Sequence, residues 1–87
     1  MVSHERLAVG AAAVATPTVP AWARTAWMQA DGGAVRYRLD GGNPTTSTGL
    51  ALQDNQPAVV VNAPDLVAGL RFISESGSVA VEIAYFG

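Results

Sequence analysis

Turn-forming residues cut this chain into short segments, and their spacing constrains the fold more than any other sequence feature. Gly, Pro, Asn, Asp and Ser gather at residues 31–33, 40–44, 54–57, 63–65 and 75–77, roughly eight to twelve residues apart. No helical pattern long enough for a crossover between parallel strands occurs. The pattern predicts an all-β fold of about seven or eight strands, arranged as a small antiparallel sandwich or barrel.

Two segments show the alternation of a half-buried strand. Residues 34–40 place apolar side chains at every second position, and residues 78–86 do the same. We interpret residues 31–33 and 75–77 as hairpin turns beside them. Further strands are expected at residues 23–30, 49–53, 58–62 and 69–74, with a single helical turn at 63–67.

The N-terminal segment differs from the rest. Residues 5–13 are rich in Ala with no polar face, which indicates an extended arm or edge strand. Pro17 and Pro20 stiffen the chain that follows. We therefore divide the sequence into an extended arm with a Pro-rich spacer, residues 1–20, and a β-sandwich domain, residues 21–87.

The start of the chain loosely resembles a secretion signal that ends in the triplet A-W-A at residues 21–23. Its apolar stretch is mostly Ala and Gly and is followed by two prolines, so we expect no cleavage there. No run of 18 apolar residues is present, and we expect no membrane partner.

The composition points to a partner surface. Charged residues make up 14% of the 87 residues, against about 25% in an average soluble domain. The chain has no cysteine, so no disulfide can stabilise a core this small. We expect a homo-oligomer, for which a trimer is one form; a soluble monomer with an Ala- and Gly-rich surface stays open as the alternative.

The sequence gives little support for nucleic-acid binding or for catalysis. Five arginines lie scattered among seven acids at a net charge of −2, which is not the basic stripe of a nucleic-acid partner. His4 is the single histidine and lies outside any expected cleft, and the acids fall singly, mostly in turns. We predict a protein that is not an enzyme, with no catalytic residue, no metal site and no cofactor.

Large side chains divide into core and contact candidates. Trp27, Tyr37, Phe72 and Tyr85 occupy alternating strand positions and are expected in the core. Trp22 and Phe86 lie near segment ends, where large aromatics can anchor an interface. The candidate interface residues are Leu7, Val9, Val14, Pro17, Pro20, Trp22, Arg36, Arg38 and Phe86.

The segment V-R-Y-R-L-D-G-G-N-P-T-T-S-T-G, residues 35–49, is the most distinctive. Asp40 can accept hydrogen bonds from turn amides, and Arg36 or Arg38 could bind a carboxylate through two nitrogens. This is either a well-bonded structural loop or a place of contact with a ligand or partner. The candidate structural residues are Asp40, Gly41, Gly42, Pro44, Thr45 and Gly49.

The order of these pieces resembles a small protein family of tailed bacteriophages and prophages. The resemblance covers about residues 22–87: the strand A-W-M-Q-A, then V-R-Y-R-x-D-G-x-x-P-T-x-x-x-G, then residues 66–73 and the end I-A-Y-F. It implies a virion structural protein, such as a capsid decoration or cement protein that contacts the major capsid protein or other virion proteins. It implies synthesis in the host bacterial cytoplasm and a final location in the virion.

A second likeness is shorter. Residues 37–45, Y-x-x-D-G-x-x-P-T, resemble the immunoglobulin-like domains attached to chitobiases and other bacterial carbohydrate-active enzymes. It implies a carbohydrate-binding or adhesion module in which Trp22 or Trp27 stacks on sugar rings beside the Thr-rich loop. A bacterial scaffold domain outside any phage is a third possibility.

Overall fold

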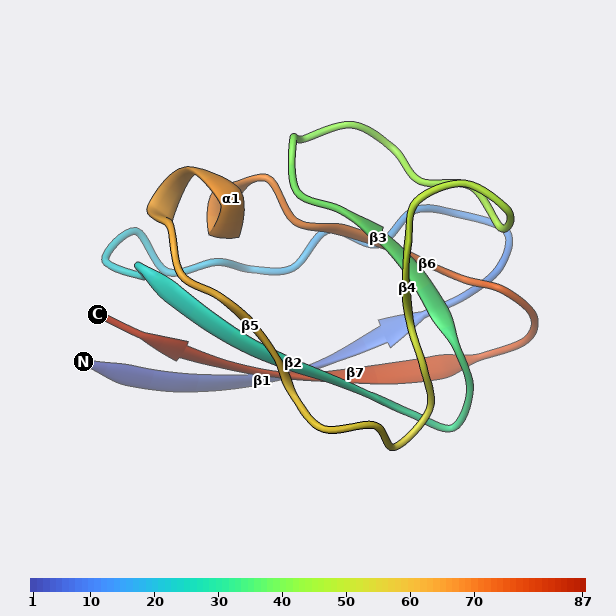
Figure 1. The fold of residues 1–87 in the computed structure, drawn as a ribbon, viewed down its shortest axis with the longest axis horizontal. Helices are drawn as coiled ribbons and strands as arrows, with labels where there is room; N and C mark the ends of the chain where they lie inside the picture. Colours follow the sequence, from blue (N-terminus) through green and yellow to red (C-terminus); the bar gives the residue numbers. More distant parts are fainter.

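The computed structural model describes residues 1–87 and is nearly all β, as the turn spacing predicts. Seven strands form two sheets that face each other, with one short helix at the side (Figure 1). The elements are β1 Val2–Val9, β2 Thr25–Asp31, β3 Val35–Arg38, β4 Leu50–Leu52, β5 Val59–Val61, α1 Pro64–Ala68, β6 Arg71–Ser74 and β7 Val79–Phe86.

Each sheet is antiparallel throughout. The four-stranded sheet has the order β1-β7-β2-β5, and the three-stranded sheet has the order β4-β3-β6. Strands β1 and β7 run side by side, so the two ends of the chain lie together, where the Gly87 amide donates to the Met1 carbonyl at 3.0 Å (Figure 1).

The core lies between the sheets and follows the predicted alternation. In β7 every second residue is buried, from Val79 to Tyr85, while the residues between them are partly exposed. Tyr37 and Phe72 of the three-stranded sheet pack with ring centroids 6.2 Å apart. The core positions predicted for Tyr37, Phe72 and Tyr85 are confirmed, since each is at most 6% exposed.

The two predicted hairpins are wrong. The turn at residues 31–33 links β2 to β3, and the turn at 75–77 links β6 to β7, but in both cases the two strands belong to different sheets. Turn residues determine where the chain reverses and not whether the next strand pairs with the last. Here each strand has one apolar face, and placing successive strands in opposite sheets buries both faces against each other.

Of the two forms expected for the N-terminal segment, an extended arm or an edge strand, the structure shows the edge strand, because β1 lies at the edge of the four-stranded sheet. All eight residues of β1 pair with β7. The chain then crosses to the other sheet, where the Gly10 carbonyl accepts from the Ser74 amide at 3.0 Å and Ala15 pairs with Phe72. Pairing within one chain satisfies the β7 edge without the entropy cost of association. Residues 1–20 are thus part of the sandwich.

Helix α1 is seated by a close backbone contact at Gly69, the residue that ends it. A Cβ added at Gly69 would lie 2.1 Å from the Leu39 carbonyl oxygen. The Gly69 carbonyl also accepts a hydrogen bond from the Gly41 amide at 3.0 Å. This contact fixes the helix against the chain that leaves β3.

A proline scan of β1 should show which of its amides bond to β7. The bond from Gly87 to Met1 sets the phase of the antiparallel ladder, so odd-numbered residues of β1 direct N–H and C=O toward β7 and even-numbered ones toward solvent. Leu7→Pro should lower the free energy of unfolding by about 2–4 kcal/mol, because it removes a ladder donor and leaves an acceptor unpaired. Urea unfolding checks this.

Two controls complete that experiment. Leu7→Ala separates the loss of the side chain from the loss of the amide, and Ala8→Pro removes an amide that faces solvent. Equal destabilisation by Leu7→Pro and Ala8→Pro would contradict the register.

Gly69→Ala should destabilise the fold by about 1–3 kcal/mol or more, because the methyl group meets a backbone carbonyl that cannot rotate away. Gly10→Ala is the matched control, since nothing lies within 4 Å of a Cβ at Gly10. Thermal unfolding of the two variants beside the parent chain measures the difference. A Gly69→Ala protein as stable as Gly10→Ala would show that α1 is not seated as described.

Candidate functional site

The four-stranded sheet has one side whose side chains point away from the core, and we call this side the outer face. It carries both an apolar patch and a row of charged side chains. Cross-strand pairing orders these side chains into rows across β1, β7 and β2. The rows are Val2, Phe86 and Thr25; His4, Ala84 and Trp27; Arg6, Glu82 and Gln29; and Ala8, Ala80 and Asp31.

One half of the outer face is apolar. Trp27 is 49% exposed and pairs with Val60 of β5, which is 51% exposed. The Trp27 and Phe86 rings pack with centroids 5.7 Å apart and planes inclined by 56°. Val2 lies opposite Phe86 on the neighbouring strand and is 71% exposed. These four side chains lie next to one another and form one apolar patch on the outer face.

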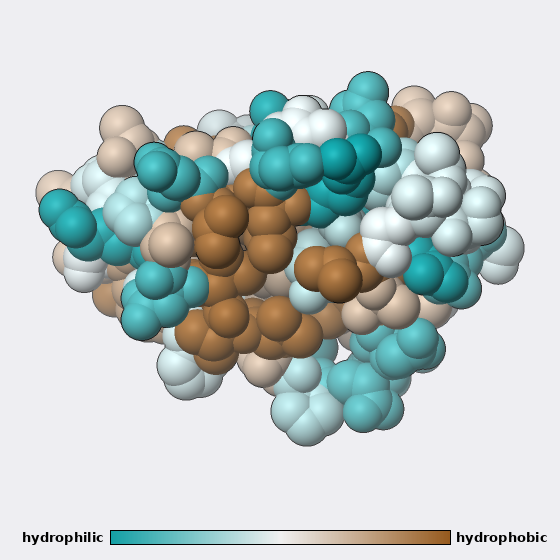
Figure 2. Space-filling view, turned by 45° about the horizontal axis from the view of Figure 1, so that its top comes forward, coloured by the Kyte–Doolittle hydropathy of each residue, from teal (hydrophilic) through white to brown (hydrophobic).

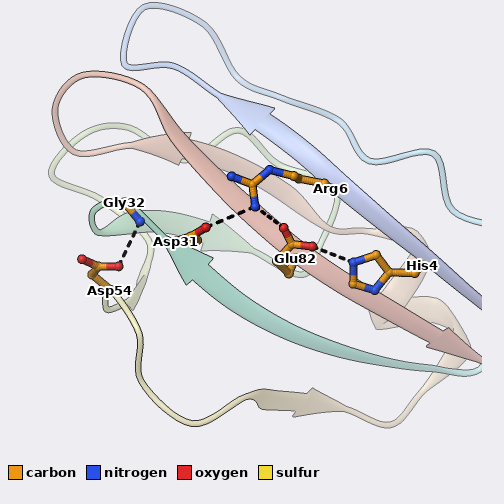
Figure 3. Close-up of polar contacts among 6 residues, drawn as sticks. All are labelled: His4, Arg6, Asp31, Gly32, Asp54 and Glu82. Atoms are coloured by element: carbon orange, nitrogen blue, oxygen red, sulfur yellow. Dashed lines mark hydrogen bonds and ion pairs between the residues drawn. The ribbon is translucent and has the colours of Figure 1, made fainter.

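The other half is a row of paired charges, drawn in Figure 3. Arg6 donates to Glu82 and also to Asp31, the latter at 3.1 Å. The His4 ring and the second oxygen of Glu82 lie 2.6 Å apart. The structure places His4 in β1, outside any cleft, where its ring faces a carboxylate of the next strand.

These contacts shift two ionisation equilibria in the row. Hydrogen bonds from His4 and Arg6 lower the pKa of Glu82 below its ordinary value. The same bond to Glu82, together with the one to Asp31, raises the pKa of Arg6. The ionised forms of Glu82 and Arg6 are therefore favoured, and both have oppositely charged partners within the same chain.

An apolar groove lies on another side of the molecule, beside α1. Tyr37, Leu39, Leu50 and Leu66 line it together with the loop after β3, and its volume is about 320 Å³. Leu50 lies on the same side of β4 as the buried Leu52 but is 53% exposed, and it lines the groove. Figure 2 shows hydrophobic side chains gathered in the middle of a face framed by hydrophilic ones.

The distinctive loop after β3 is bonded largely as predicted. Both oxygens of Asp40 accept from the Arg38 guanidinium, at 3.1 and 2.5 Å, and Oδ1 also accepts from the Gly42 amide at 3.0 Å. These bonds lower the pKa of Asp40. Gly41 has a φ of 79°, and Pro44 is buried. Thr45 pairs with Thr48 across the tip, before Gly49 at a φ of 128°.

The predicted interface residues do not gather in one place. Within the core or packed against it lie Leu7, Val9, Pro17 and Trp22, while Val14 and Pro20 are half-buried. Arg36 bonds to Glu75 at 2.8 Å, and with Arg38 it lies on the three-stranded sheet. Of the nine, only Phe86 belongs to the outer face.

The core position predicted for Trp27 is wrong. The sequence carried the signal that would have found this: Trp27 shares its side of β2 with Thr25 and Gln29, while the opposite side is Ala26, Met28 and Ala30. The opposite side is buried completely. Polar neighbours on the same side of a strand indicate solvent more reliably than the size of one aromatic ring.

Comparisons with known proteins found no relative of this chain. No family model, no curated protein and no solved structure matches the chain. The one helix, α1, is far too short and too polar to span a membrane. No group of three or more His, Cys, Asp or Glu side chains is placed to hold a metal ion.

The Glu82 contacts predict a pH dependence of stability. The pKa of Glu82 is lower in the folded state, so its contribution is present above about pH 4.3 and is lost as the pH falls through the folded value. Glu82→Gln should reduce the drop in urea midpoint between pH 7 and pH 3. Asp65→Asn is the control, since no side-chain bond holds Asp65. An unchanged drop in Glu82→Gln would contradict the assignment.

Proposed function

We propose that this chain is a non-enzymatic structural protein of a tailed-phage virion, of the capsid decoration or cement kind, and that it acts by contact with other protein subunits. The observation that carries the contact role is the half-exposed Trp27 on the outer face of β2, packed against Phe86 and beside Val60. Interfaces are enriched in large aromatic side chains surrounded by smaller apolar ones.

The virion assignment rests on the sequence resemblance over residues 22–87. Its pieces occupy connected parts of the fold: A-W-M-Q-A lies in β2, the long motif spans β3 and the following loop, and I-A-Y-F ends β7. The motif's Asp40 and Gly residues hold the loop through Arg38 and the turn amides. The residues of the motif are thus explained by the structure of the loop. The A-W-M-Q-A segment contributes Trp27, the proposed contact residue.

The carbohydrate-binding alternative draws on the same tryptophan. Sugar recognition requires an exposed ring with hydrogen-bonding groups beside it. Ala84 and Val60 flank Trp27, and the nearby Thr25 hydroxyl already bonds to Asn62 at 2.7 Å. The Thr-rich loop lies on the other sheet, between β3 and β4. The nearby Thr25 hydroxyl is thus already bonded and the Thr-rich loop lies away from Trp27, which favours a protein partner over a glycan.

Mass spectrometry of purified particles tests the proposed role. Virions induced from the genome that encodes the chain should contain it in many copies per particle, at a constant ratio to the major capsid protein. Particles that lack the chain, while infected cells contain it, would contradict the proposal. Binding of the purified chain to a glycan array, lost in Trp27→Ala with folding intact, would instead favour the carbohydrate-binding role.

A further inference from the structure

Strand β1 leaves one of its two edges without a backbone partner. It is the outermost strand of the four-stranded sheet, and it pairs with β7 alone (Figure 1). Because the odd-numbered residues of β1 direct their N–H and C=O groups toward β7, the even-numbered residues direct theirs away from the sheet. No hydrogen bond within the chain uses the backbone groups of these residues, which are Val2, His4, Arg6 and Ala8.

The other edges of the two sheets are short or covered. Strands β4 and β5 have three residues each. Residues 10–15 cover β6, since the Ser74 amide bonds to Gly10 and Phe72 pairs with Ala15. Strand β1 has eight residues, contains no proline and keeps one unbroken register with β7. It therefore has no bulge, proline or short length to prevent another strand from pairing with it.

A charged side chain that points inward can also protect an edge, and β1 has one in Glu5. The Glu5 carboxylate already has partners within the chain, since it accepts from the Tyr85 hydroxyl at 2.8 Å and from the Thr18 amide at 3.1 Å. Thr18 thus meets β1 on the core side of the sheet, and no backbone bond joins it to the free edge. A strand added at this edge would leave Glu5 with the partners that it has now.

We propose that the free edge of β1 binds an extended segment of a partner protein, which adds to the four-stranded sheet as an antiparallel strand. A row of outward N–H and C=O groups is complementary to the backbone of another strand, and main-chain bonds of this kind bind peptides at sheet edges. Antiparallel order continues the pattern of the sheet. The inference goes beyond the proposed function, because it concerns an edge that can bind such a segment with or without a virion.

The charges beside the edge indicate which side chains the added strand carries. Residues that lie opposite each other in an antiparallel pair project on the same side of the sheet. Both bonds of Arg6 are donated by Nη1, so Nε and Nη2 can still donate, and the side chain is 59% exposed (Figure 3). A carboxylate opposite Arg6 and an uncharged side chain opposite Glu5 are therefore favoured.

A second copy of β1 meets these requirements poorly. Pairing of two copies about a two-fold axis along the whole edge would place His4 opposite Arg6, and Glu5 opposite Glu5 of the other copy. Like charges directly opposite each other destabilise a strand pair. A shift by two residues in either direction leaves one end of the edge unpaired and places His4 or Arg6 opposite itself. The occupant is therefore a different polypeptide.

A blocked synthetic peptide of eight residues, V-T-V-E-T-T-V-T, tests the proposal. Paired along the whole edge, it places its Glu opposite Arg6 and a Thr opposite Glu5. We expect it to bind the full chain with a dissociation constant below about 1 mM, measured by NMR titration. Binding should slow the hydrogen exchange of the amides of Val2, His4, Arg6 and Ala8, while the odd-numbered amides of β1 are protected with or without the peptide.

Two changes in the peptide report on the bonds and on the charge. In the expected register the second, fourth, sixth and eighth peptide amides bond to β1. N-methylation of these amides should abolish binding, whereas N-methylation of the third, fifth and seventh amides should change the dissociation constant by less than about threefold. Replacing the peptide Glu by Lys should weaken binding at least about threefold, because Lys lies opposite Arg6.

Two variants of the chain complete the test. Ala8→Pro removes an outward N–H and places a ring at the edge, so it should keep the fold and weaken peptide binding at least about tenfold. Ala8→Thr is the matched control, since it keeps the amide, and it should bind within about twofold of the parent chain.

The outcomes separate the edge from the virion role. No binding at millimolar peptide, or binding that is indifferent to Ala8→Pro and to which amides are methylated, overturns the inference even if virions contain the chain. A chain that associates with itself through this edge, and loses that association in Ala8→Pro, overturns the choice of partner. Binding with the expected pattern supports the inference, and absence of the chain from virions would overturn only the virion role.

Discussion

The double pairing of β7 is the interaction on which the rest of the structure depends. β7 bonds to β1 along eight residues on one side and to β2 along seven on the other. Its inward side chains, from Val79 to Tyr85, form the middle of the core. β2 and β3 also pair on both sides, but over fewer residues, so β7 has the longest ladders of the domain.

The N-terminal segment takes its place from that constraint. If residues 2–9 left the sheet, β7 would become an edge with unpaired amides, and Val9 would lose its burial. The Glu5 carboxylate connects the same strand to the core, since it accepts from the Tyr85 hydroxyl at 2.8 Å and from the Thr18 amide. Burial and this bond raise the pKa of Tyr85 above its ordinary value.

Local pattern was enough to predict the strands but not their partners. Period-two alternation identified β3 and β7 and their buried sides, because burial depends on each residue and its neighbours two positions away. Sheet membership depends on which distant strand covers each face, and no local signal in residues 31–33 or 75–77 specifies that. The arm and the edge strand could not be told apart for the same reason: the Ala-rich composition of residues 5–13 gives no sign that β7 is the strand with which this segment pairs.

Part of the candidate surface could be predicted and part could not. Phe86 was recognised from its position, and the Arg38–Asp40 pair from its two-residue spacing. The Arg6, His4 and Glu82 cluster joins residues that are 76 and 78 positions apart, so only the β1–β7 register reveals it. The groove is still less visible in the sequence, because its lining comes from β3 and the following loop, β4 and α1.

The orientation of β2 decides which of its side chains lie on the outer face. A shift of this strand by one residue would turn Thr25, Trp27 and Gln29 inward and Ala26, Met28 and Ala30 outward. Burying the polar pair would leave groups without partners, so the observed register is the favourable one for the fold. Thr25 and Gln29 therefore favour the observed orientation of β2, and position 27 points outward with them. The fold explains why position 27 points outward, and the proposed contact role gives a reason for a large aromatic side chain at that position.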